Sequence, residues 1–285
     1  ISMISFTGSS LTGTKIMEAC APKLSQVALE LGGKSALVIF DDTDLYKAVE
    51  TTMKGFLTNG GQICTAHTRL VVQDSFKTKL LNKLKEELEK LPFCNDPITE
   101  KDRGDRAWED GMTDVVQPIV CESQHKKVLR FLDEAKSAGV EFLTGGNVPD
   151  AETVGNTGGY FIQPTVLVNV ERDSDVWQKE VFGPVLSVRT FSTEQEAVLE
   201  ANSTAFGLAS TVMSSDPAKA MRVANRIRAG AVYATSNGEG LLAEHPAVSR
   251  GGFGCSGVGR ELGIGGLHEY TCLLYTSDAA DDRMR

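Results

Sequence analysis

The chain has 285 residues, of which 41% are hydrophobic and 24% charged, and its formal net charge is −9. This composition is ordinary for a soluble globular protein, and the length suffices for one large domain or two smaller ones. The surplus of acidic residues argues against nonspecific binding to nucleic acid or to an anionic membrane, because both require an excess of Lys and Arg. No apolar run reaches the roughly 20 residues of a membrane-spanning helix.

The first residues predict a strand, a glycine-bearing turn and a helix. Residues 4–7 have the composition of a buried strand and residues 14–20 that of a helix, with Gly8, Ser9 and Gly13 between them. Such a turn can present backbone N–H groups to a phosphate. It equally fits a tight turn that needs glycine for its backbone angles and binds nothing. Because the chain begins as if within a strand, we expect it to be the downstream part of a longer protein.

The remaining elements predict an α/β fold. In chain order we expect strands at residues 27–31 and 36–40, a helix at 45–57, a strand at 69–73, a helix at 74–91, a helix at 125–138, strands at 161–168 and 185–191, and helices at 193–201 and 217–228. Strands that alternate with helices indicate a parallel sheet. Residues 92–118 lack periodicity and are predicted to be a long surface excursion.

Six cysteines are scattered along the chain, without a C-x-x-C pair and without histidines at zinc-binding spacing. We therefore expect no metal site, and reduced thiols in a reducing intracellular compartment such as the cytoplasm, a plastid or a mitochondrion. One of the six, Cys64, differs from the others in its surroundings, because it follows the run Asn-Gly-Gly-Gln-Ile.

Cys64 and an upstream carboxylate, Glu30, are the candidate catalytic pair. A thiol on a glycine-rich approach can attack a carbonyl group if a base takes up a proton or activates water, and Glu30 can be that base. Gly60 and Gly61 leave room for a substrate, and the backbone N–H of Cys64 can help to hold an oxyanion. The flanking Gln62 and Thr65 fit either a catalytic or a turn role.

A second carboxylate, Glu180, precedes Val181, Phe182 and a Gly-Pro turn. This pattern fits a simple turn into a sheet. It also fits a site in which Glu180 binds the hydroxyl groups of a ribose and Phe182 lies against a nicotinamide. The glycine-rich run at residues 257–263 is interpreted as structural.

A cysteine hydrolase is the alternative reading of Cys64, with Gln62 two positions before the thiol. In that class a histidine must pair with the thiol. The candidates are His67, His245 and His268, none of which lies in a recognisable motif, and Glu30 would have no role.

Five sequence islands together resemble the aldehyde dehydrogenase superfamily. They are Phe6-Thr7-Gly8-Ser9, Glu30-Leu31-Gly32-Gly33-Lys34-Ser35, Gly61-Gln62-Ile63-Cys64, Glu180-Val181-Phe182-Gly183-Pro184 and Ser256-Gly257-Val258-Gly259-Arg260-Glu261. The resemblance covers residues 1–271, the C-terminal half of a typical member. The spelling of residues 176–182 is most similar to the betaine-aldehyde and aminoaldehyde branch.

The resemblance implies a role for each matching residue. Cys64 would be the nucleophile and Glu30 the general base. The residues implied to bind the cofactor are Gly8, Ser9 and Gly13 at the pyrophosphate, Glu180 at the nicotinamide ribose, and Leu31 and Phe182 beside the nicotinamide ring. It further implies NAD or NADP as cofactor, a small aldehyde as substrate, and a homodimer or homotetramer at full length.

It also implies an organisation into segments. Residues 1–33 would be the last part of a Rossmann-like dinucleotide-binding domain, residues 34–258 an aldehyde dehydrogenase-like catalytic α/β domain, and residues 259–271 a lead into an oligomerisation strand. Residues 272–285 are similar to a translated sequencing adapter, so we expect them to be an artefact. On this organisation the chain by itself would be inactive.

Three positions depart from the family pattern. Thr58 stands where the aminoaldehyde branch often has an aromatic residue, Arg250 where the family usually has Trp or Phe, and Ala234-Thr235-Ser236 lacks the usual Val-Asn. These departures concern the substrate more than the reaction class. A catalytically dead paralogue or scaffold of the same fold is a further alternative.

Overall fold

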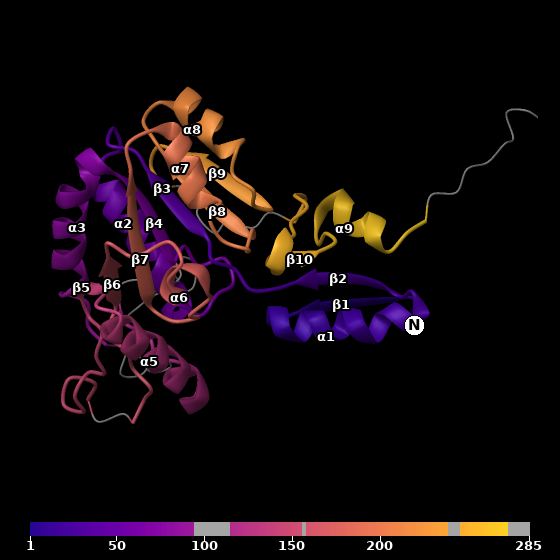
Figure 1. Cartoon of the computed structure of the whole chain (residues 1–285), viewed down its shortest axis with the longest axis horizontal. Coiled ribbons are helices and arrows are strands. Elements are labelled where there is room, and N and C mark those ends of the chain that lie inside the picture. The colour runs from indigo at the N-terminus through magenta and orange to yellow at the C-terminus, as the bar shows by residue number, and fades with distance from the viewer. Residues whose placement is uncertain (94–114, 156–157, 239–245, 273–285) are drawn as a thin grey trace, which may run out of the picture.

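The computed structural model describes residues 1–93, 115–155, 158–238 and 246–272, and within them the strands form two sheets (Figure 1). The smaller sheet has the order β1-β2-β10 and the larger has the order β5-β6-β7-β4-β3-β8-β9. The mixed α/β architecture predicted from the sequence is confirmed.

The smaller sheet joins the two ends of the described chain. β1 (Met3–Thr7) lies parallel to β2 (Gln26–Glu30), and α1 (Ser10–Cys20) and the short η1 (Ala21–Lys23) connect them. β10 (Gly257–Val258) adds to the free edge of β2 in the antiparallel direction. The C-terminal residues are therefore placed directly beside the end of β2, where Glu30 lies.

The larger sheet is parallel except at β5, which pairs with β6 in the antiparallel direction. Its strands are β3 (Ala36–Ile39), β4 (Arg69–Gln73), β5 (Glu141–Thr144), β6 (Thr165–Val168), β7 (Val185–Phe191), β8 (Ala209–Met213) and β9 (Ala231–Thr235). The other elements are α2 (Leu45–Leu57), η2 (Thr58–Gly61), α3 (Asp74–Leu88), α5 (Glu122–Ser137), α6 (Asp175–Gln178), α7 (Glu194–Ala201), α8 (Pro217–Ala224), η4 (Gly254–Ser256) and α9 (Gly263–Glu269).

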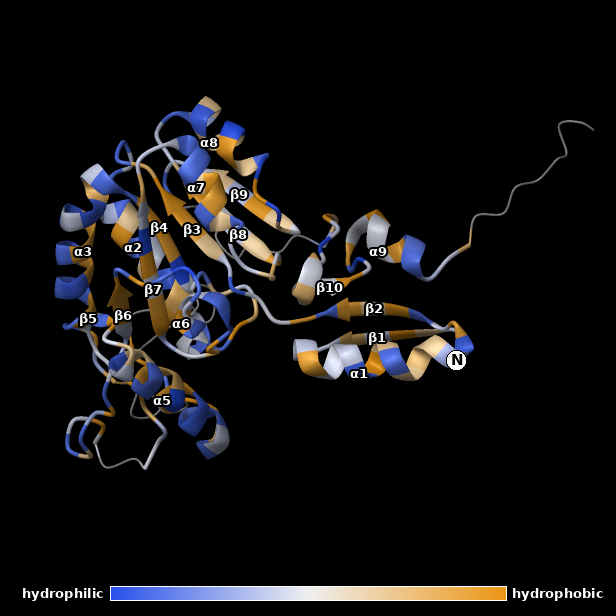
Figure 2. Ribbon diagram, in the orientation of Figure 1, coloured by the Kyte–Doolittle hydropathy of each residue, from blue (hydrophilic) through white to orange (hydrophobic). Residues whose placement is uncertain are grey.

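Helices cover both faces of this sheet. Along β3, Leu37 and Ile39 pack in one core cluster with α2 and α3, whereas Val38 packs in a second cluster with α5, α6, α7 and α8. Both faces being buried explains why the central strands are near-continuous apolar runs. Figure 2 shows this pattern as orange strands between helices whose outer faces are blue.

Several predicted boundaries differ from the structure for local reasons. α3 ends at Leu88 and not at residue 91, because Leu91 precedes Pro92 and the residue before a proline disfavours the helical conformation. β6 begins at Thr165 and not at residue 161, since Pro164 cannot donate to a strand ladder. Most of the predicted excursion at residues 92–118, and nearly all of the tail at 272–285, lie outside the described residues.

Ser256 ties the two sheets together close to the end of β2. Its buried hydroxyl donates to the carbonyl of Gly32 at 2.7 Å and accepts from the N–H of Gly207 at 3.0 Å. Gly32 follows β2, and Gly207 precedes β8. One side chain thus fixes the connection between the sheets where Glu30 emerges.

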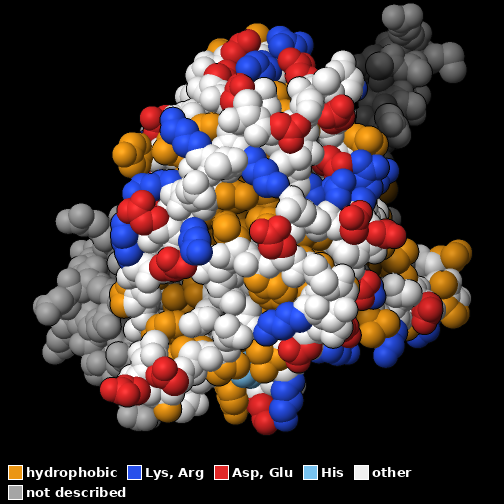
Figure 3. Space-filling model, turned by 60° about the vertical axis from the view of Figure 1, so that its left-hand side comes forward, with side chains coloured by type: hydrophobic (Ala, Val, Ile, Leu, Met, Phe, Trp, Pro, Cys, Tyr) orange, Lys and Arg blue, Asp and Glu red, His pale blue; other side chains and the backbone are white. Residues whose placement is uncertain are grey.

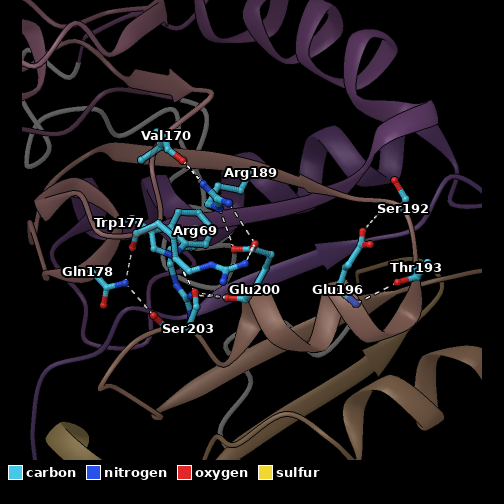
Figure 4. A network of polar contacts seen from close by, with 11 residues as sticks. Arg69, Val170, Trp177, Gln178, Arg189, Ser192, Thr193, Glu196, Glu200 and Ser203 are labelled. Atoms are coloured by element: carbon cyan, nitrogen blue, oxygen red, sulfur yellow. Dashed lines mark hydrogen bonds and ion pairs between the residues drawn. The ribbon is translucent and has the colours of Figure 1, made fainter.

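A second polar network lies inside the large sheet (Figure 4). The buried Arg69 guanidinium donates to the carbonyls of Lys34 at 2.7 Å, Glu200 at 2.8 Å and Ala201 at 2.6 Å, and its Cζ lies 5.0 Å from the Trp177 ring centre. Glu200 in turn accepts from Arg189 at 2.8 Å. Burial lowers the pKa of Arg69 to about 9, so it is still a cation at neutral pH.

The described helices include none that is both long and apolar enough to cross a membrane. On the face shown in Figure 3, Lys and Arg side chains lie among Asp and Glu side chains, and no single sign of charge dominates.

Candidate active site

The Cys64 loop has an unusual backbone immediately before the thiol. Asn59, Gly60 and Gly61 have φ values of 55°, 64° and 73°, all in the left-handed region. A Cβ atom on Gly61 would lie 2.3 Å from the carbonyl oxygen of Gly183, so this position requires glycine for both its φ and its packing. The loop is thereby pressed against the turn that follows Glu180.

Gln62 holds the loop in place. Its side-chain amide donates to the carbonyls of Asn59 at 3.1 Å and Pro118 at 3.2 Å, and its side-chain oxygen accepts from the N–H of Val120 at 2.8 Å. Of the two roles that the sequence left open for Gln62, the structure supports the turn role.

Gly33 brings three segments together. A Cβ atom on Gly33 would lie 2.2 Å from the carbonyl oxygen of Cys64, so only glycine permits this close approach. The N–H of Gly33 donates to Oε1 of Glu180 at 3.0 Å. The segment after β2, the Cys64 loop and Glu180 therefore meet at one point, although they are far apart in the sequence.

Glu30 is the last residue of β2, and its side chain is only 3% exposed. Both of its carboxylate oxygens accept from Arg250, with Nη2 at 2.5 Å from Oε2 and Nε at 3.1 Å from Oε1. Arg250 is held by backbone hydrogen bonds of 2.8 Å in both directions with Glu261. The sequence noted Arg250 as a departure from the family pattern but gave no sign that it contacts Glu30.

The charges around Cys64 determine the reactivity of its thiol. Burial raises the pKa of Cys64, and the negative charges of Glu30 and Glu180 raise it further, whereas Arg250 acts in the opposite direction. Burial also raises the pKa of Glu180, against the stabilising N–H of Gly33. The resting site therefore favours the neutral thiol at neutral pH.

We predict that Cys64 reacts more slowly with iodoacetamide than Cys121 at pH 8, because only the thiolate attacks. Cys121 is the matched comparison in the same chain, since it is exposed and a hydrogen bond with Ser123 lowers its pKa. The reaction of Cys64 should still accelerate with pH above 9, after that of Cys121 has levelled off. Mass spectrometry of the alkylated peptides measures both rates, and equal rates and equal pH profiles would contradict the assigned charges.

Lys34 is a buried group that the sequence analysis did not single out. Its side chain is 1% exposed, and Nζ has no hydrogen-bond partner among the described residues. Burial, helped by the charge of Arg69, lowers the pKa of Lys34 to about 7, while Glu180 opposes the shift. Such a group is recognisable only once the fold shows that the strand connection is enclosed.

The predicted cofactor residues of the first turn lie together at the start of α1. Ser9 caps the helix by accepting from the N–H of Thr12 at 3.2 Å, and Gly8 and Ser9 are exposed. The N–H of Gly8 donates to the carbonyl of Glu30 at 3.0 Å. Gly13 is buried against the side chain of Leu31, which places Leu31 beneath the helix.

Phe182 has a strained backbone. Its φ of 59° is in the left-handed region, which bulky residues rarely adopt. The side-chain amide of Gln124 donates to the carbonyls of Val181 at 3.0 Å and Phe182 at 2.8 Å and so holds this conformation. Strain of this kind concentrates at functional sites.

Histidine does not pair with the thiol within the described residues. His67 is fully buried and hydrogen-bonds to Thr211 at 3.0 Å, and burial lowers its pKa to about 3. His268 is exposed on α9, and His245 lies outside the described residues. Across the described ranges there is also no cluster of His, Cys, Asp and Glu able to hold a metal ion.

The chain belongs to the aldehyde dehydrogenase family, whose family model matches residues 1–274. It is 41% identical to aminoaldehyde dehydrogenase 1, peroxisomal, of Pisum sativum over 282 residues, which cover 98% of this chain and 52% of that protein. It is 36% identical to the chloroplastic betaine aldehyde dehydrogenase of Beta vulgaris, with 99% and 52% covered. The chain thus spans about half the length of these curated relatives.

Solved structures agree with the sequence comparison. Betaine aldehyde dehydrogenase from Staphylococcus aureus, in complex with NAD+, superimposes with a TM-score of 0.84 at 36% identity, covering 95% of this chain and 50% of that one. An NAD-dependent aldehyde dehydrogenase from Sinorhizobium meliloti gives a TM-score of 0.82 at 34% identity, with 95% and 49% covered. The resemblance to the family inferred from the sequence is therefore confirmed.

Proposed function

We propose that a full-length protein containing this chain oxidises an aldehyde to a carboxylic acid, with NAD or NADP as electron acceptor. The observation that carries this proposal is the meeting of Cys64, Glu30 and Glu180 around Gly32 and Gly33, within a chain of the aldehyde dehydrogenase family. Each of these groups supplies one element that the reaction requires.

The chemistry of the chain begins at Cys64. Its thiolate attacks the carbonyl carbon of the aldehyde and forms a hemithioacetal, and removal of two electrons and a proton converts this adduct to a thioester. Glu30 then takes a proton from water, and the resulting hydroxide attacks the thioester carbon. The acid departs with Cys64 as the leaving thiolate, and Glu30 releases the proton that it took from water, so both side chains return to their starting state after one turnover.

The bound nicotinamide supplies the two-electron acceptor of this reaction. The residues present fit a dinucleotide, because the exposed N-terminus of α1 at Gly8 and Ser9 can hold an anionic pyrophosphate. Gly13 allows α1 to pack closely on the side chain of Leu31. Glu180, oriented by the N–H of Gly33, would hold the ribose hydroxyls, and Leu31 and Phe182 would flank the nicotinamide.

The substrate is proposed to be a small aldehyde, and the full-length protein a homodimer or homotetramer. Several relatives are named aminoaldehyde or betaine aldehyde dehydrogenases and are labelled peroxisomal or chloroplastic. The cysteines within the described residues are all free, which agrees with a reducing compartment.

The test is to follow nicotinamide reduction by the full-length protein with a panel of aldehydes and with NAD or NADP. The proposal expects aldehyde-dependent reduction that disappears after alkylation of Cys64, and a thioester on Cys64 that acid quenching traps. If the protein binds the dinucleotide but forms no thioester with any aldehyde, it is a catalytically dead paralogue and the proposal is wrong.

A further inference from the structure

The ion pair between Arg250 and Glu30 conflicts with the proposed role of Glu30 as a general base. A base takes a proton through a carboxylate oxygen, yet both oxygens of Glu30 accept hydrogen bonds from one guanidinium, at 2.5 and 3.1 Å. Two-point guanidinium–carboxylate pairs are among the stronger hydrogen-bonded contacts in proteins. In this geometry the guanidinium occupies one acceptor position on each oxygen of Glu30 and fixes the carboxylate against Arg250, so we expect activation of water to require the pair to open.

Backbone contacts fix both members of the Arg250–Glu30 pair. Glu30 ends β2 and is 3% exposed at its side chain, while Arg250 is 22% exposed and its backbone is fixed to Glu261 on the segment that leads into α9. β10 adds to β2 beside Glu30, which holds the segment after Arg250 against the same strand. The contact joins residues that are 220 positions apart.

We propose that Arg250 is a positioning residue that withholds Glu30 while Cys64 attacks, and that the ion pair opens before Glu30 activates water. The proposal rests on the proposed function, in which Cys64 and Glu30 act in successive steps. In the closed pair the positive charge of Arg250 offsets the carboxylate beside the thiol, which eases formation of the thiolate. In the open pair an oxygen of Glu30 is released for the hydrolysis step.

Several charged and polar groups face Cys64, Glu30 and Arg250. Cys64 is influenced by Arg250, Glu30 and Glu180, and by the N–H of Thr65. Glu261 also faces both Glu30 and Arg250, and Tyr233 faces Arg250. Glu180 and Glu261 stay in place in the variants below, so their contributions cancel in each comparison.

The first test is a double-mutant cycle read as Cys64 alkylation by iodoacetamide at pH 8, which requires neither aldehyde nor nicotinamide. Glu30→Gln removes the negative charge and should speed alkylation, whereas Arg250→Met leaves Glu30 without its counter-charge and should slow it. Each effect is expected to be about tenfold, the change in thiolate fraction for one pKa unit. The double variant should return close to the starting rate.

The opposite signs separate this proposal from a structural role. Loosening of the site would expose the thiol and speed alkylation in both single variants. Arg260→Met is the matched control, because Arg260 lies on the same segment, stacks on Phe253 at 4.9 Å and donates to the carbonyl of Gly259. It should leave the rate unchanged. Equal signs for the two single variants, or no effect of Arg250→Met, would overturn the proposal.

The second test isolates the opening of the pair. p-Nitrophenyl acetate acetylates Cys64 with loss of p-nitrophenolate, and hydrolysis of the resulting thioester then depends on Glu30 alone. Arg250→Lys keeps the charge but cannot make the two-point contact, so the open state is more populated and hydrolysis should be faster by about tenfold. Rescue of the alkylation rate by the same lysine is also expected.

The rate of thioester hydrolysis decides whether Arg250 withholds Glu30. Faster thioester hydrolysis in Arg250→Lys, abolished by adding Glu30→Gln, supports the withheld base. Hydrolysis at the starting rate or slower in Arg250→Lys would show that Arg250 does not withhold Glu30. Since neither assay uses an aldehyde or a nicotinamide, failure of the proposed oxidation would leave the result for Arg250 readable.

Discussion

Replacing Cys64 with serine is expected to abolish aldehyde-dependent nicotinamide reduction in the full-length protein, with a fall in kcat on the order of 10⁴-fold or more. A serine hydroxyl at this position has no adjacent base that could ionise it, because Glu30 is engaged by Arg250 and no described histidine contacts the site. The dinucleotide should still bind with unchanged affinity, since Cys64 is not among the residues proposed to hold it and the exchange of sulfur for oxygen leaves the Gly33–Glu180 contact in place.

Steady-state kinetics and nicotinamide titration measure the two effects separately. Cys121→Ser is the matched control, because Cys121 is an exposed thiol at the N-cap of α5 and the substitution should leave kcat within error of the starting protein. More than a tenth of the original kcat in Cys64→Ser would reject Cys64 as the nucleophile. In a cysteine hydrolase, by contrast, substitution of the histidine that pairs with Cys64 would also abolish ester cleavage, whereas an aldehyde dehydrogenase should tolerate it.

The parts of the fold that the sequence predicted are those that local patterns determine. Asp44 caps α2 by accepting from the N–H of Lys47 at 3.0 Å, and the apolar runs of β3 and β4 are buried on both faces. The strands β8 and β9 were not predicted, because each contains both polar and apolar side chains and so forms no apolar run. Ser210 and Thr211 are buried in β8 only because they hydrogen-bond to Ala36 and His67 on neighbouring segments.

The candidate site also contains residues that local motifs indicate and a contact that they do not. Cys64, Glu30 and Glu180 lie in recognisable local motifs, and the structure places them around one glycine pair. Arg250 pairs with Glu30 across 220 positions, through a two-residue strand that has no pattern of its own. A contact of that kind depends on how β10 meets β2, so no window of sequence around either residue could have indicated it.

Helix ends show how tertiary contacts override local pattern. α8 was predicted to continue to residue 228, but it ends at Ala224. The side chain of Asn202 accepts from the N–H of Arg228 at 2.7 Å and donates to the carbonyl of Arg226 at 2.9 Å. These bonds from the end of α7 satisfy the backbone groups that a longer α8 would have paired internally, so the chain turns toward β9.

Replacing Arg69 with methionine is expected to destabilise the protein by about 4 kcal/mol, because the buried carbonyls of Lys34 and Ala201 lose their Arg69 donor and each costs roughly 1–3 kcal/mol when left unpaired. The carbonyl of Glu200 also loses Arg69 but keeps the hydroxyl of Ser203 as a donor at 2.7 Å. Methionine fills similar volume against Trp177, so the loss is mainly one of hydrogen bonding and of the charge that faces Glu200.

The midpoint of urea-induced unfolding of the full-length protein measures this cost. Arg130→Met on the exposed surface of α5 is the matched control, since Arg130 makes a 3.6 Å ion pair with Glu134 and exposed pairs contribute about 0.5 kcal/mol. Arg69→Lys keeps the charge but not the three-carbonyl contact and should fall between the two. A midpoint for Arg69→Met equal to that of Arg130→Met would show that the carbonyls find other donors.

Because the carbonyl of Lys34 follows Gly33, the loss of Arg69 should also loosen the segment that holds Glu180, and Cys64 alkylation should then be faster in Arg69→Met than in Arg130→Met.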